Sequence, residues 1–481
     1  MLESHADHAG LRRFKPYPAY KDSGVEWLGE IPAHWDLLPI KRVASIRYGL
    51  GEPPRELVDG LPFIRATNVA RGRIDDRDLK MVDPEDVPWA RNPTLRTDDI
   101  IVVRSGAYTG DSAIIPAKYD GAVAGYDMVI RARGAAPSFL AWALLSKYML
   151  HAQIELETTR AAQPHLNAEE LGSVVAILPP HSEQRAITAF LDRETARIDA
   201  LVAKKERLIE LLQEKRTALI TRAVTKGLPS TGSGQAEPNI PMKDSGVEWL
   251  GEIPAHWEVK RIKNLSMFVT SGSRGWAEHY TDEGALFLRI GNLRTASIDL
   301  DLSDVQHVTP PPGAEGERTR VRAGDLLISI TALIGAVGVV PEGTPAAFVN
   351  QHLALVRLSS SKVLPRWLGY CVLSRVGQEQ LHADLYGGTK DGLSLDDIRS
   401  LVVLVPPTIE QERVIDILDS AGRHVDTLIT KVRDAIDHLK ELRSALISAA
   451  VTGKIDVRST GHSGESRNPG QGKTGPRLSP G

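Results

Sequence analysis

The stretch KDSGVEWLGEIPAHW occurs twice in this chain, at Lys21–Trp35 and, letter for letter, at Lys243–Trp257. Fainter matches follow each copy in the same order: FIRATNVARGRID from Phe63 resembles FLRIGNLRTASID from Phe287, RTDDIIVVRSGAYTG from Arg96 resembles RAGDLLISITALIG from Arg322, and GSVVAILPPHSEQ from Gly172 resembles RSLVVLVPPTIEQ from Arg399. Two repeats of ~225 residues are far longer than the units of a solenoid, so the pattern indicates a duplicated domain plan.

Length and composition restrict the class of protein. A chain of 481 residues is long enough for two or three domains, each with its own core. No uninterrupted apolar run approaches the ~20 residues of a membrane helix, and the first twenty residues lack the apolar centre of a secretory signal. The single cysteine, Cys371, excludes an internal disulfide and a cysteine-based zinc cluster. We therefore expect a cytoplasmic protein without membrane contact.

The first part of each repeat has the pattern of a compact α+β domain. Short β-rich runs such as IIVV from Ile100 and DLLISI from Asp325 are bounded by glycine and proline turns. Short helical patterns lie between these runs, for instance FLAWALLSKYML from Phe139. The alternation predicts a mixed helix and sheet domain in each repeat.

The second part of each repeat is a long helix. After Pro179-Pro180, Ser182 is a candidate cap for a helix that has no proline or glycine until Gly227. After Pro406-Pro407, Thr408 and Gln411 have the spacing of a capping box. At 1.5 Å rise per residue, each helix is expected to be roughly 60 Å long.

Both helices carry an apolar heptad, the pattern of a coiled-coil seam. In the second helix the seam comprises Val414, Ala421, Leu428, Ala435, Leu442 and Ala449 with Leu418, Val425, Val432, Leu439 and Leu446. In the first helix it comprises Leu191, Ile198, Leu212 and Leu219 with Ile187, Leu201 and Leu208, interrupted by Lys205 and Lys215. The preferred prediction is an antiparallel coiled coil of the two helices. The alternative is that each helix folds back on its own domain.

These patterns give a complete domain plan. The predicted segments are an N-terminal extension at 1–20, a first α+β domain at 21–180, a first long helix at 181–227, a linker at 228–242, a second α+β domain at 243–407, a second long helix at 408–454 and a disordered tail at 455–481. The linker and the tail are rich in glycine, proline and serine, which is typical of flexible segments.

Motifs of catalysis are missing from the sequence. GAYTGDSA from Gly106 lacks the lysine of a phosphate-binding loop, and no glycine-rich turn indicates a bound dinucleotide or S-adenosylmethionine. The histidines show no metal-ligand spacing, and His34 and His256 beside their tryptophans favour a packing role. We therefore expect no cofactor, no metal and no catalytic residue. A nuclease-like set of Asp76, Asp78 and Lys80 is the weaker interpretation, because charged residues on a polar loop usually form a solvated face.

Several loops combine arginine or lysine with amide, hydroxyl or aromatic side chains, the types that grip phosphates and read base edges. The expected DNA-contacting residues are Arg65, Asn68, Arg71, Arg73, Arg104, Ser105, Tyr108, Thr109, Arg160 and Gln163 in the first repeat, and Arg274, Arg289, Asn292, Arg294, Ser329, Thr331, Thr389 and Lys390 in the second. For any single residue, a solvated surface loop is an equally good interpretation. The pairing of related frames with different polar loops favours two modules that read two short sequences.

The order of these motifs resembles the specificity (S) subunits of type I restriction–modification systems. The resemblance rests on the duplicated GEIPAHW, on the PPxxEQ entry to each long helix, and on the helix ends TALITRAVTKG from Thr217 and SALISAAVTGK from Ser444. It covers nearly the whole chain except the first ~20 residues and the tail. One departure is the polar interruption of the first seam at Lys205 and Lys215.

The resemblance implies a division of labour. Each α+β domain would be a target recognition domain that reads one half of a bipartite double-stranded DNA target. The long helices would be spacers that set the distance between the two half-sites and dock two methyltransferase (M) subunits. The M subunits would bring S-adenosylmethionine, restriction (R) subunits would bring ATP-driven cleavage, and the S subunit would have no catalysis of its own. Two alternatives are a self-sufficient DNA-modifying enzyme with unrecognised motifs and a coiled-coil scaffold that binds only proteins.

The repeated segment itself is expected to be structural. Val25, Trp27, Leu28, Ile31 and Trp35 are the candidates for burial against the domain and the helix base, with Gly29 and Pro32 shaping the turn. A recent duplication explains the identity of the two copies equally well.

Overall fold

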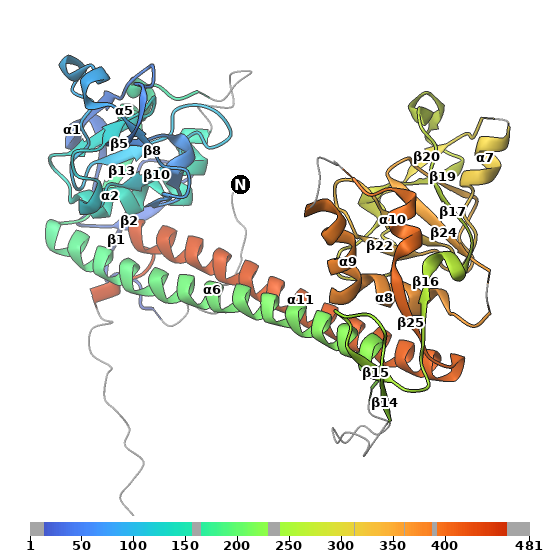
Figure 1. Ribbon diagram of the computed structural model, residues 1–481. Helices are drawn as coiled ribbons and strands as arrows, with labels where there is room; N and C mark the ends of the chain where they lie inside the picture. Colours follow the sequence, from blue (N-terminus) through green and yellow to red (C-terminus); the bar gives the residue numbers. More distant parts are fainter. Residues whose placement is uncertain are drawn as a thin grey trace, which may run out of the picture. The chain divides into compact units, whose positions relative to one another are not determined.

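The structure is a computed structural model that describes residues 14–155, 165–228, 241–311, 313–359, 361–386 and 392–458. Its contacts divide the chain into two units, Met1–Ala203 with Ala435–Gly481 and Lys204–Asp434 (Figure 1). The boundaries cut both long helices, so each unit contains a mixed domain and parts of both helices. Within the described residues, no helix is both long and apolar enough to cross a membrane.

The first unit contains a mixed domain of short strands and helices. Its strands are β1 (Tyr20–Asp22), β2 (Glu30–Pro32), β3 (Asp36–Pro39), β4 (Ala44–Tyr48), β5 (Glu56–Ile64), β6 (Val69–Ala70), β7 (Arg73–Ile74), β8 (Lys80–Val82), β9 (Ile100–Val102), β10 (Ser112–Ile114), β11 (Val123–Ala124), β12 (Met128–Ala132) and β13 (Val175–Leu178). Its helices are α1 (Ile40–Val43), α2 (Pro137–Leu144), α3 (Lys147–Met149), α5 (Ala168–Ser173) and parts of α6 (His181–Lys226) and α11 (Thr408–Val451). An antiparallel sheet in the order β10-β9-β12-β4 packs beside a β11-β5-β8 sheet whose β11–β5 pair is parallel.

The second unit repeats the main sheets of this plan. Its strands are β14 (Met242–Asp244), β15 (Glu252–Pro254), β16 (Glu258–Arg261), β17 (Ser266–Ser271), β18 (Tyr280–Thr281), β19 (Ala285–Leu288), β20 (Gln306–Val308), β21 (Leu326–Ser329), β22 (Val337–Val339), β23 (Ala347–Val349), β24 (Leu353–Leu358) and β25 (Val402–Val405). Its helices are α7 (Ala314–Thr319), α8 (Pro365–Leu373), α9 (Arg375–Tyr386) and α10 (Leu395–Ser400). The sheet β22-β21-β24-β17 matches β10-β9-β12-β4, and the parallel β19–β23 pair matches β5–β11. The predicted α+β fold and the duplication are confirmed.

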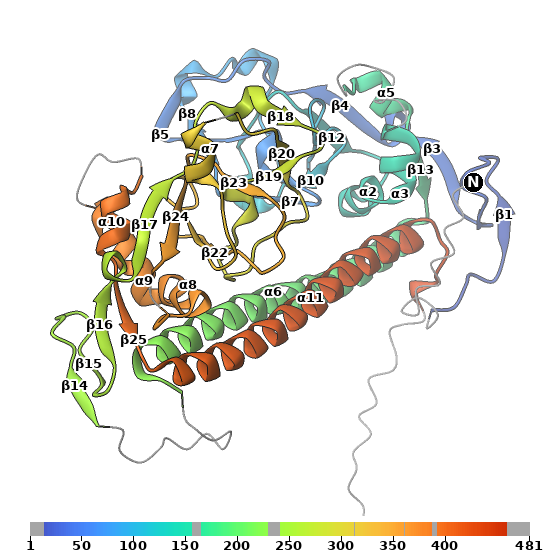
Figure 2. The same ribbon diagram turned by 90° about the vertical axis from the view of Figure 1, so that its right-hand side faces the viewer.

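The two long helices pack on each other within each unit. In the first unit, Ile187, Leu191 and Ile198 of α6 share a core with Leu446 and Ala450 of α11. In the second unit, Ile220 and Val224 of α6 share a core with Val414 and Leu418 of α11. Figures 1 and 2 both show α6 and α11 side by side and running in opposite directions. These contacts favour mutual pairing over helices that fold back only on their own domains.

The packed face of α6 differs from the predicted seam at one of its two positions. Leu201 and Leu208, placed in the seam by the heptad count, are 42% and 43% exposed. The inward position lies one residue further along, where Thr195 and Arg216 are buried and Val202 is half-buried. The polar Thr195 and Arg216 hide this position from a count of apolar residues, which is why the heptad pointed elsewhere.

The repeated segment holds the first turn of the helix in its own repeat. Trp35 donates from Nε1 to Glu183 Oε2 at 3.0 Å, and His34 Nε2 lies 2.7 Å from Glu183 Oε1. In the second copy, Trp257 Nε1 lies 3.2 Å from both carboxylate oxygens of Glu410, and His256 Nε2 lies 2.8 Å from Oε2. The two sequence motifs of each repeat, GEIPAHW and PPxxEQ, are therefore one structural contact.

The glutamine of PPxxEQ ties each helix to its domain. Gln184 accepts from the Ala136 N–H at 2.7 Å and donates to the Pro179 carbonyl at 2.8 Å. Gln411 likewise accepts from the Leu364 N–H at 2.9 Å and donates to Pro406 and Lys362 carbonyls at 2.8 and 2.7 Å. The predicted capping box of Thr408 and Gln411 is corrected, since the amide of Gln411 is used outside the helix. The first helix begins at His181, one residue before its predicted cap.

The far end of each helix reaches the repeated segment of the other repeat. Lys226 at the end of α6 donates to the Glu252 carbonyl, and Lys454 after α11 donates to the equivalent Glu30 carbonyl at 2.9 Å. The glycine beside each lysine, Gly227 or Gly453, has a φ of 75° or 72°, a value that favours glycine.

Burial within the repeated segment and the tail corrects two expectations. Ile31, Trp35, Ile253 and Trp257 are fully buried, whereas Trp27 is 44% exposed and does not join them in the core. Residues 455–458 were predicted to belong to the disordered tail, but the side chains of Ile455 and Val457 are buried in the first unit's core. The rest of the predicted tail, the residues 1–13 and most of the linker lie outside the described residues.

Candidate nucleic-acid interface

An equivalent Asp–Arg ion pair joins the same two strands in both domains. Arg131 on β12 donates from Nε to Asp99 Oδ1 at 2.7 Å, and Arg357 on β24 donates to Asp325 Oδ1 at 2.8 Å. Both carboxylates are 2% exposed and also accept a backbone N–H three residues earlier in the chain. The two pairs stand at the starts of β9 and β21, at the opposite ends of these strands from the loops that follow them, so both domains share one strand frame although the loop sequences differ.

Two predicted DNA-contacting residues are structural. Asn68 is fully buried, accepts from the Arg65 N–H at 3.1 Å and donates to the Asp75 carbonyl at 3.0 Å. Asn292 is 2% exposed and makes the equivalent bonds to Arg289 and Asp301, at 2.9 and 2.8 Å. Because their amides are already used to hold a loop, the expectation that they read bases is corrected.

The arginines on these two loops lie nearer to the surface. Arg65 pairs with Asp78 at 3.2 Å, and Arg294 pairs with Asp301 at 2.9 Å. Ser303 and Arg294 together hold the pKa of Asp301 at about 2, so this carboxylate stays ionised. Arg289 is half-buried, while Arg274 on a neighbouring loop of the second domain is exposed.

The RSGAYTG loop of the first domain presents polar groups at the surface. Ser105 Oγ lies 2.8 Å from His165 Nδ1, and the guanidinium of Arg104 lies 3.2 Å from the other ring nitrogen of His165. Tyr108 is 60% exposed, and Thr109 donates to the Gly106 carbonyl at 2.7 Å. Three of the four predicted residues here therefore have side chains that extend outward or bond to one surface histidine.

The matching segment of the second domain holds its polar side chains differently. Ser329, the last residue of β21, is fully buried and donates to the Thr331 carbonyl at 2.7 Å, so its predicted DNA contact is corrected. Thr331 Oγ1 lies 2.8 Å from His352 Nδ1, and Gln351 Nε2 lies 3.2 Å from the other nitrogen of His352. His352 and Gln351 were missed, because no arginine or lysine stands beside them in the polar run Asn350-Gln351-His352.

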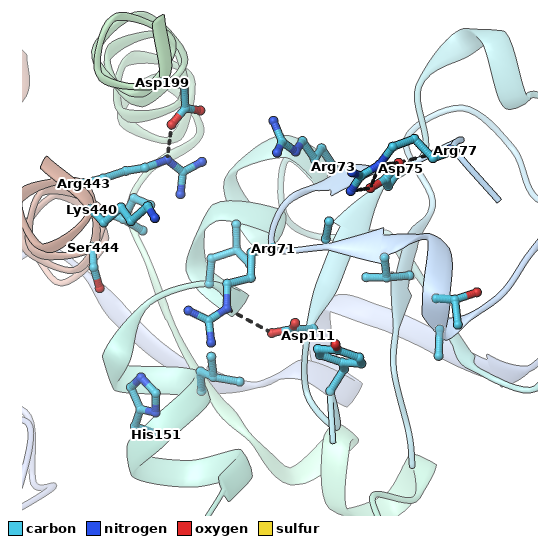
Figure 3. Close-up of a pocket in the computed structure, with 18 residues that line it drawn as sticks. Arg71, Arg73, Asp75, Arg77, Asp111, His151, Asp199, Lys440, Arg443 and Ser444 are labelled. Carbon is cyan, nitrogen blue, oxygen red and sulfur yellow. Dashed lines mark hydrogen bonds and ion pairs between the residues drawn. The ribbon is translucent and has the colours of Figure 1, made fainter. Parts of the chain in front are cut away.

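Predicted residues of the first domain meet both long helices around one cavity. The cavity has a volume of about 750 Å³. Figure 3 shows Arg71 and Arg73 facing Lys440, Arg443 and Asp199 across it. Tyr108 also lines it. Lys440 and Arg443 were missed, because the heptad pattern assigned their segment only to a spacer helix.

Charge around this cavity is predominantly basic. Arginine or lysine supplies five of the labelled lining residues and aspartate three. Arg71 has an unusual backbone φ of 32°, and its Nε lies 3.6 Å from Asp111 Oδ1. Burial raises the pKa of Asp111 above its ordinary value, and the nearby Arg71 opposes this shift. A basic groove of this kind is suited to a polyanion.

A smaller cavity of about 380 Å³ lies at the corresponding loop of the second domain. It is lined by Arg289, Asn292, Asp301, Asp304 and Asn350, among others. The predicted Arg160, Gln163, Thr389 and Lys390 lie outside the described residues.

The nuclease-like interpretation finds no shared site in the structure. Asp76 pairs with Lys118 at 2.8 Å, whereas Lys80 pairs with Glu56 at 3.3 Å and Asp78 with Arg65. Within the part of the chain that the structure describes, no cluster of three or more histidine, cysteine or acidic side chains is arranged to hold a metal.

Comparison with known proteins identifies the class. Residues 254–438 match the family model described as the type I restriction modification DNA specificity domain. A solved structure described as the structural basis underlying complex assembly and conformational transition of the type I R-M system has the same fold, with a TM-score of 0.65 and 17% identity over 88% of this chain and 99% of that chain. The second repeat thus resembles a DNA specificity domain, on a fold that the whole chain shares.

Curated relatives make the resemblance more specific. The specificity subunit of the type I restriction enzyme EcoKI from Escherichia coli K12 is 23% identical over 89% of this chain and 91% of its own length. That of EcoBI from Escherichia coli is 22% identical, and the match spans 63% of each chain. The resemblance to type I specificity subunits that the repeated motifs predicted is confirmed.

Proposed function

We propose that this chain is the DNA sequence-recognition subunit of a type I restriction–modification complex. Each of its two domains reads one half of a bipartite DNA target. The observation that supports this most directly is that both domains have the same sheet topology but carry loops of different sequence. The Asp99–Arg131 and Asp325–Arg357 pairs join the same strands in both domains, while the loops at the other ends of those strands carry different polar side chains.

Each domain would place these loops in the major groove, where the four base pairs are distinguishable. The basic cavity beside the first domain would hold backbone phosphates through Arg71, Lys440 and Arg443. Such contacts add affinity without sequence preference and make binding salt-dependent. The recognition domains proposed at 21–180 and 243–407 would thus provide specificity, and the helix faces beside them part of the grip.

The partners proposed are two methyltransferase subunits and restriction subunits. Methyl transfer to adenine and cleavage would belong to those subunits, and S-adenosylmethionine would be bound by the methyltransferase rather than by this non-catalytic chain. Leu208 and Leu211 are 43% and 46% exposed on α6. Large apolar side chains on a helix surface suit a protein partner, so they support docking of a methyltransferase subunit there.

The paired helices at 181–227 and 408–454 would set the distance between half-sites, as dimer geometry does for two-fold DNA binders. Lengthening both helices at matched positions should change the spacer of the target and leave the two half-sites unchanged. A supercoiled seam between them remains a prediction from the heptads.

Methylome sequencing of cells that express this chain with its methyltransferase subunit tests the proposal. A split motif with methylated adenines on both sides is the expected result. Replacing residues 36–175 with the corresponding domain of another family member should then change one half-site only. If both half-sites change together, the domains do not read independently.

Two controls separate the competing functions. Purified chain incubated alone with DNA and S-adenosylmethionine, or with Mg²⁺, should neither methylate nor cleave; activity would favour a self-sufficient enzyme. A protein-only scaffold predicts no DNA affinity even with methyltransferase subunits present. Leu208→Glu should weaken assembly with the methyltransferase subunit, with Leu201→Glu as the comparison on the same helix.

A further inference from the structure

Three strands of the first domain's sheet have one of their ends at the same level: β4 and β9 end there, and β12 begins there. In the register of β4, β12 and β9, Met128 stands opposite both Tyr48 and Val102. Tyr48 therefore ends one strand beside Tyr126, which precedes the next strand, and Arg104, which follows the third. The guanidinium carbon of Arg104 lies over both rings, 4.6 Å from the centroid of Tyr48 and 4.3 Å from that of Tyr126.

The guanidinium of Arg104 has different partners from those of the arginines that form ion pairs within the domains. Arg131, Arg357 and Arg366 each bond to an aspartate that is buried or half-buried. Among the described residues, the side chain of Arg104 has no carboxylate partner and bonds to the imidazole of His165 instead. The aromatic rings therefore hold its guanidinium in place, and its charge also attracts the Asp127 carboxylate, which accepts from the Arg104 backbone N–H.

The arrangement is accessible to a ligand. The Tyr48 and Tyr126 side chains are 42% and 46% exposed, although they pack on a charged group. Arg104 itself is half-buried, and its guanidinium contacts the exposed His165. Tyr48 is itself fixed, because its hydroxyl accepts from the Ala168 N–H at 2.9 Å.

We propose that Arg104 is the residue of the first domain that reads a guanine, with Tyr48 and Tyr126 holding its guanidinium in the reading position. Arginine recognises guanine by two parallel hydrogen bonds to O6 and N7, which requires a fixed guanidinium plane. Two aromatic rings supply that plane before DNA arrives, so less side-chain entropy is lost on binding. This inference rests on the proposed function and names the chemistry of one of its contacts.

The second domain has different chemistry at the same edge. Leu166 donates to the Arg104 carbonyl at 2.8 Å, and Leu393 donates to the Ile330 carbonyl at 2.8 Å, so Ile330 occupies the position of Arg104. The strand that matches β4 ends at Ser271, opposite Ala354, and the adjacent turn carries Gln351 and His352. Ile330 carries no guanidinium, so the position that would read guanine in the first domain must act differently in the second.

The test uses the complete complex of this chain with its methyltransferase subunit. Binding is measured to the bipartite target found by methylome sequencing and to duplexes in which one guanine at a time is replaced by 7-deazaguanine, which lacks N7. The variants are Arg104→Gln, Tyr126→Leu and, as matched control, Tyr126→Phe, which keeps the ring.

Arg104→Gln should lower discrimination at one guanine of the first half-site by about 10- to 100-fold and leave the second half-site unchanged. The variant should also lose sensitivity to 7-deazaguanine at that position. Tyr126→Leu should give a smaller loss at the same base pair, and Tyr126→Phe should behave like the unmodified chain.

Two results would overturn the inference. Equal weakening on all sequences, with a smaller salt dependence, would show that Arg104 contacts a phosphate. Unchanged affinity and specificity would show that it does not contact DNA. If methylome sequencing with the wild-type complex finds no split motif, the proposed function itself is contradicted. Failure of the proposed function can therefore be distinguished from failure of the inference about Arg104.

Discussion

Arg443 of α11 donates from Nε to Asp199 Oδ1 of α6 at 3.0 Å, and the second unit contains the reciprocal pair, Arg216 of α6 with Asp426 of α11. On both helices the arginine stands 17 residues after the aspartate. One Asp–Arg spacing, present once on each helix, therefore fixes an antiparallel register within both units.

The two pairs differ in burial, and this difference predicts unequal stability effects. The Arg216 side chain is 8% exposed and also donates to the Ala296 and Gly422 carbonyls, whereas that of Arg443 is 23% exposed. Arg216→Ala should cost about 3 kcal/mol, because it removes a buried guanidinium together with its bonds to Asp426 and to the part-buried Ala296 and Gly422 carbonyls. Arg443→Ala, its matched control, should cost about 1 kcal/mol. Hydrogen exchange of residues 208–226 and 435–450 measures each locally; equal costs would contradict the role assigned to burial.

The repeated segment contains its own control for the role of its tryptophans. Trp257 is fully buried and bonds to Glu410, while Trp249 in the same copy is 53% exposed. Trp257→Ala should destabilise the second unit by about 3–5 kcal/mol through the cavity and the lost hydrogen bond to Glu410. Trp249→Ala should change stability by less than about 1 kcal/mol. Chemical denaturation followed by circular dichroism compares them, and a large effect of Trp249→Ala would show that exposure is not the deciding factor.

Gly453 is predicted to tolerate no side chain. A Cβ there would lie 2.4 Å from Pro32 and 3.0 Å from Trp35, in addition to the strain of its positive φ. Gly24 has nearly the same φ, 70°, but open space around it. Gly453→Ala should therefore cost about 2–4 kcal/mol, and Gly24→Ala about 1 kcal/mol. If thermal unfolding shows equal losses, φ alone determines the requirement for glycine.

Asp127 makes stability depend on pH. Burial raises its pKa from 3.8 to about 6, and one carboxylate oxygen has no hydrogen-bond partner. Because the folded-state pKa is the higher one, the stabilisation by the proton is complete below about pH 4 and is lost as pH rises through 6. Asp127→Asn should therefore be the more stable form at pH 7.5, by up to about 3 kcal/mol, and the advantage should vanish near pH 4. Urea titrations at both pH values check the sign, and an advantage that does not vary with pH would contradict it.

The elements that could be predicted from sequence are those encoded locally. The first long helix was expected at 181–227 and lies at His181–Lys226, since proline, glycine and a continuous helical pattern mark its ends. Asn167, a residue type favoured at helix N-termini, caps α5 and accepts from the N–H groups of Glu169 and Glu170, both at 2.9 Å. The duplication, read from one identical segment, is repeated in the strand order of both domains.

The details of the interface could not be predicted, because they depend on side-chain direction and on distant pairing. Asn68 has the residue type of a base reader, yet its amide closes a loop from inside. Tyr48, Arg104 and Tyr126 are brought together only by the register of three strands. No local pattern carries that information, so single residues of a loop were predicted without the neighbours that position them.

The hydrogen bond between Trp35 and Glu183 joins the two ends of the segment 36–182, which forms the first domain. Residues 36–182 leave and return to one fixed point, as residues 258–409 do between Trp257 and Glu410. Each domain is in this sense a large closed loop, and the entropy of closing a loop grows only slowly with its length. A domain of another size or sequence can therefore be inserted at the same point with little effect on the helices. The Trp–Glu contact is thus a point at which whole domains can be exchanged during evolution.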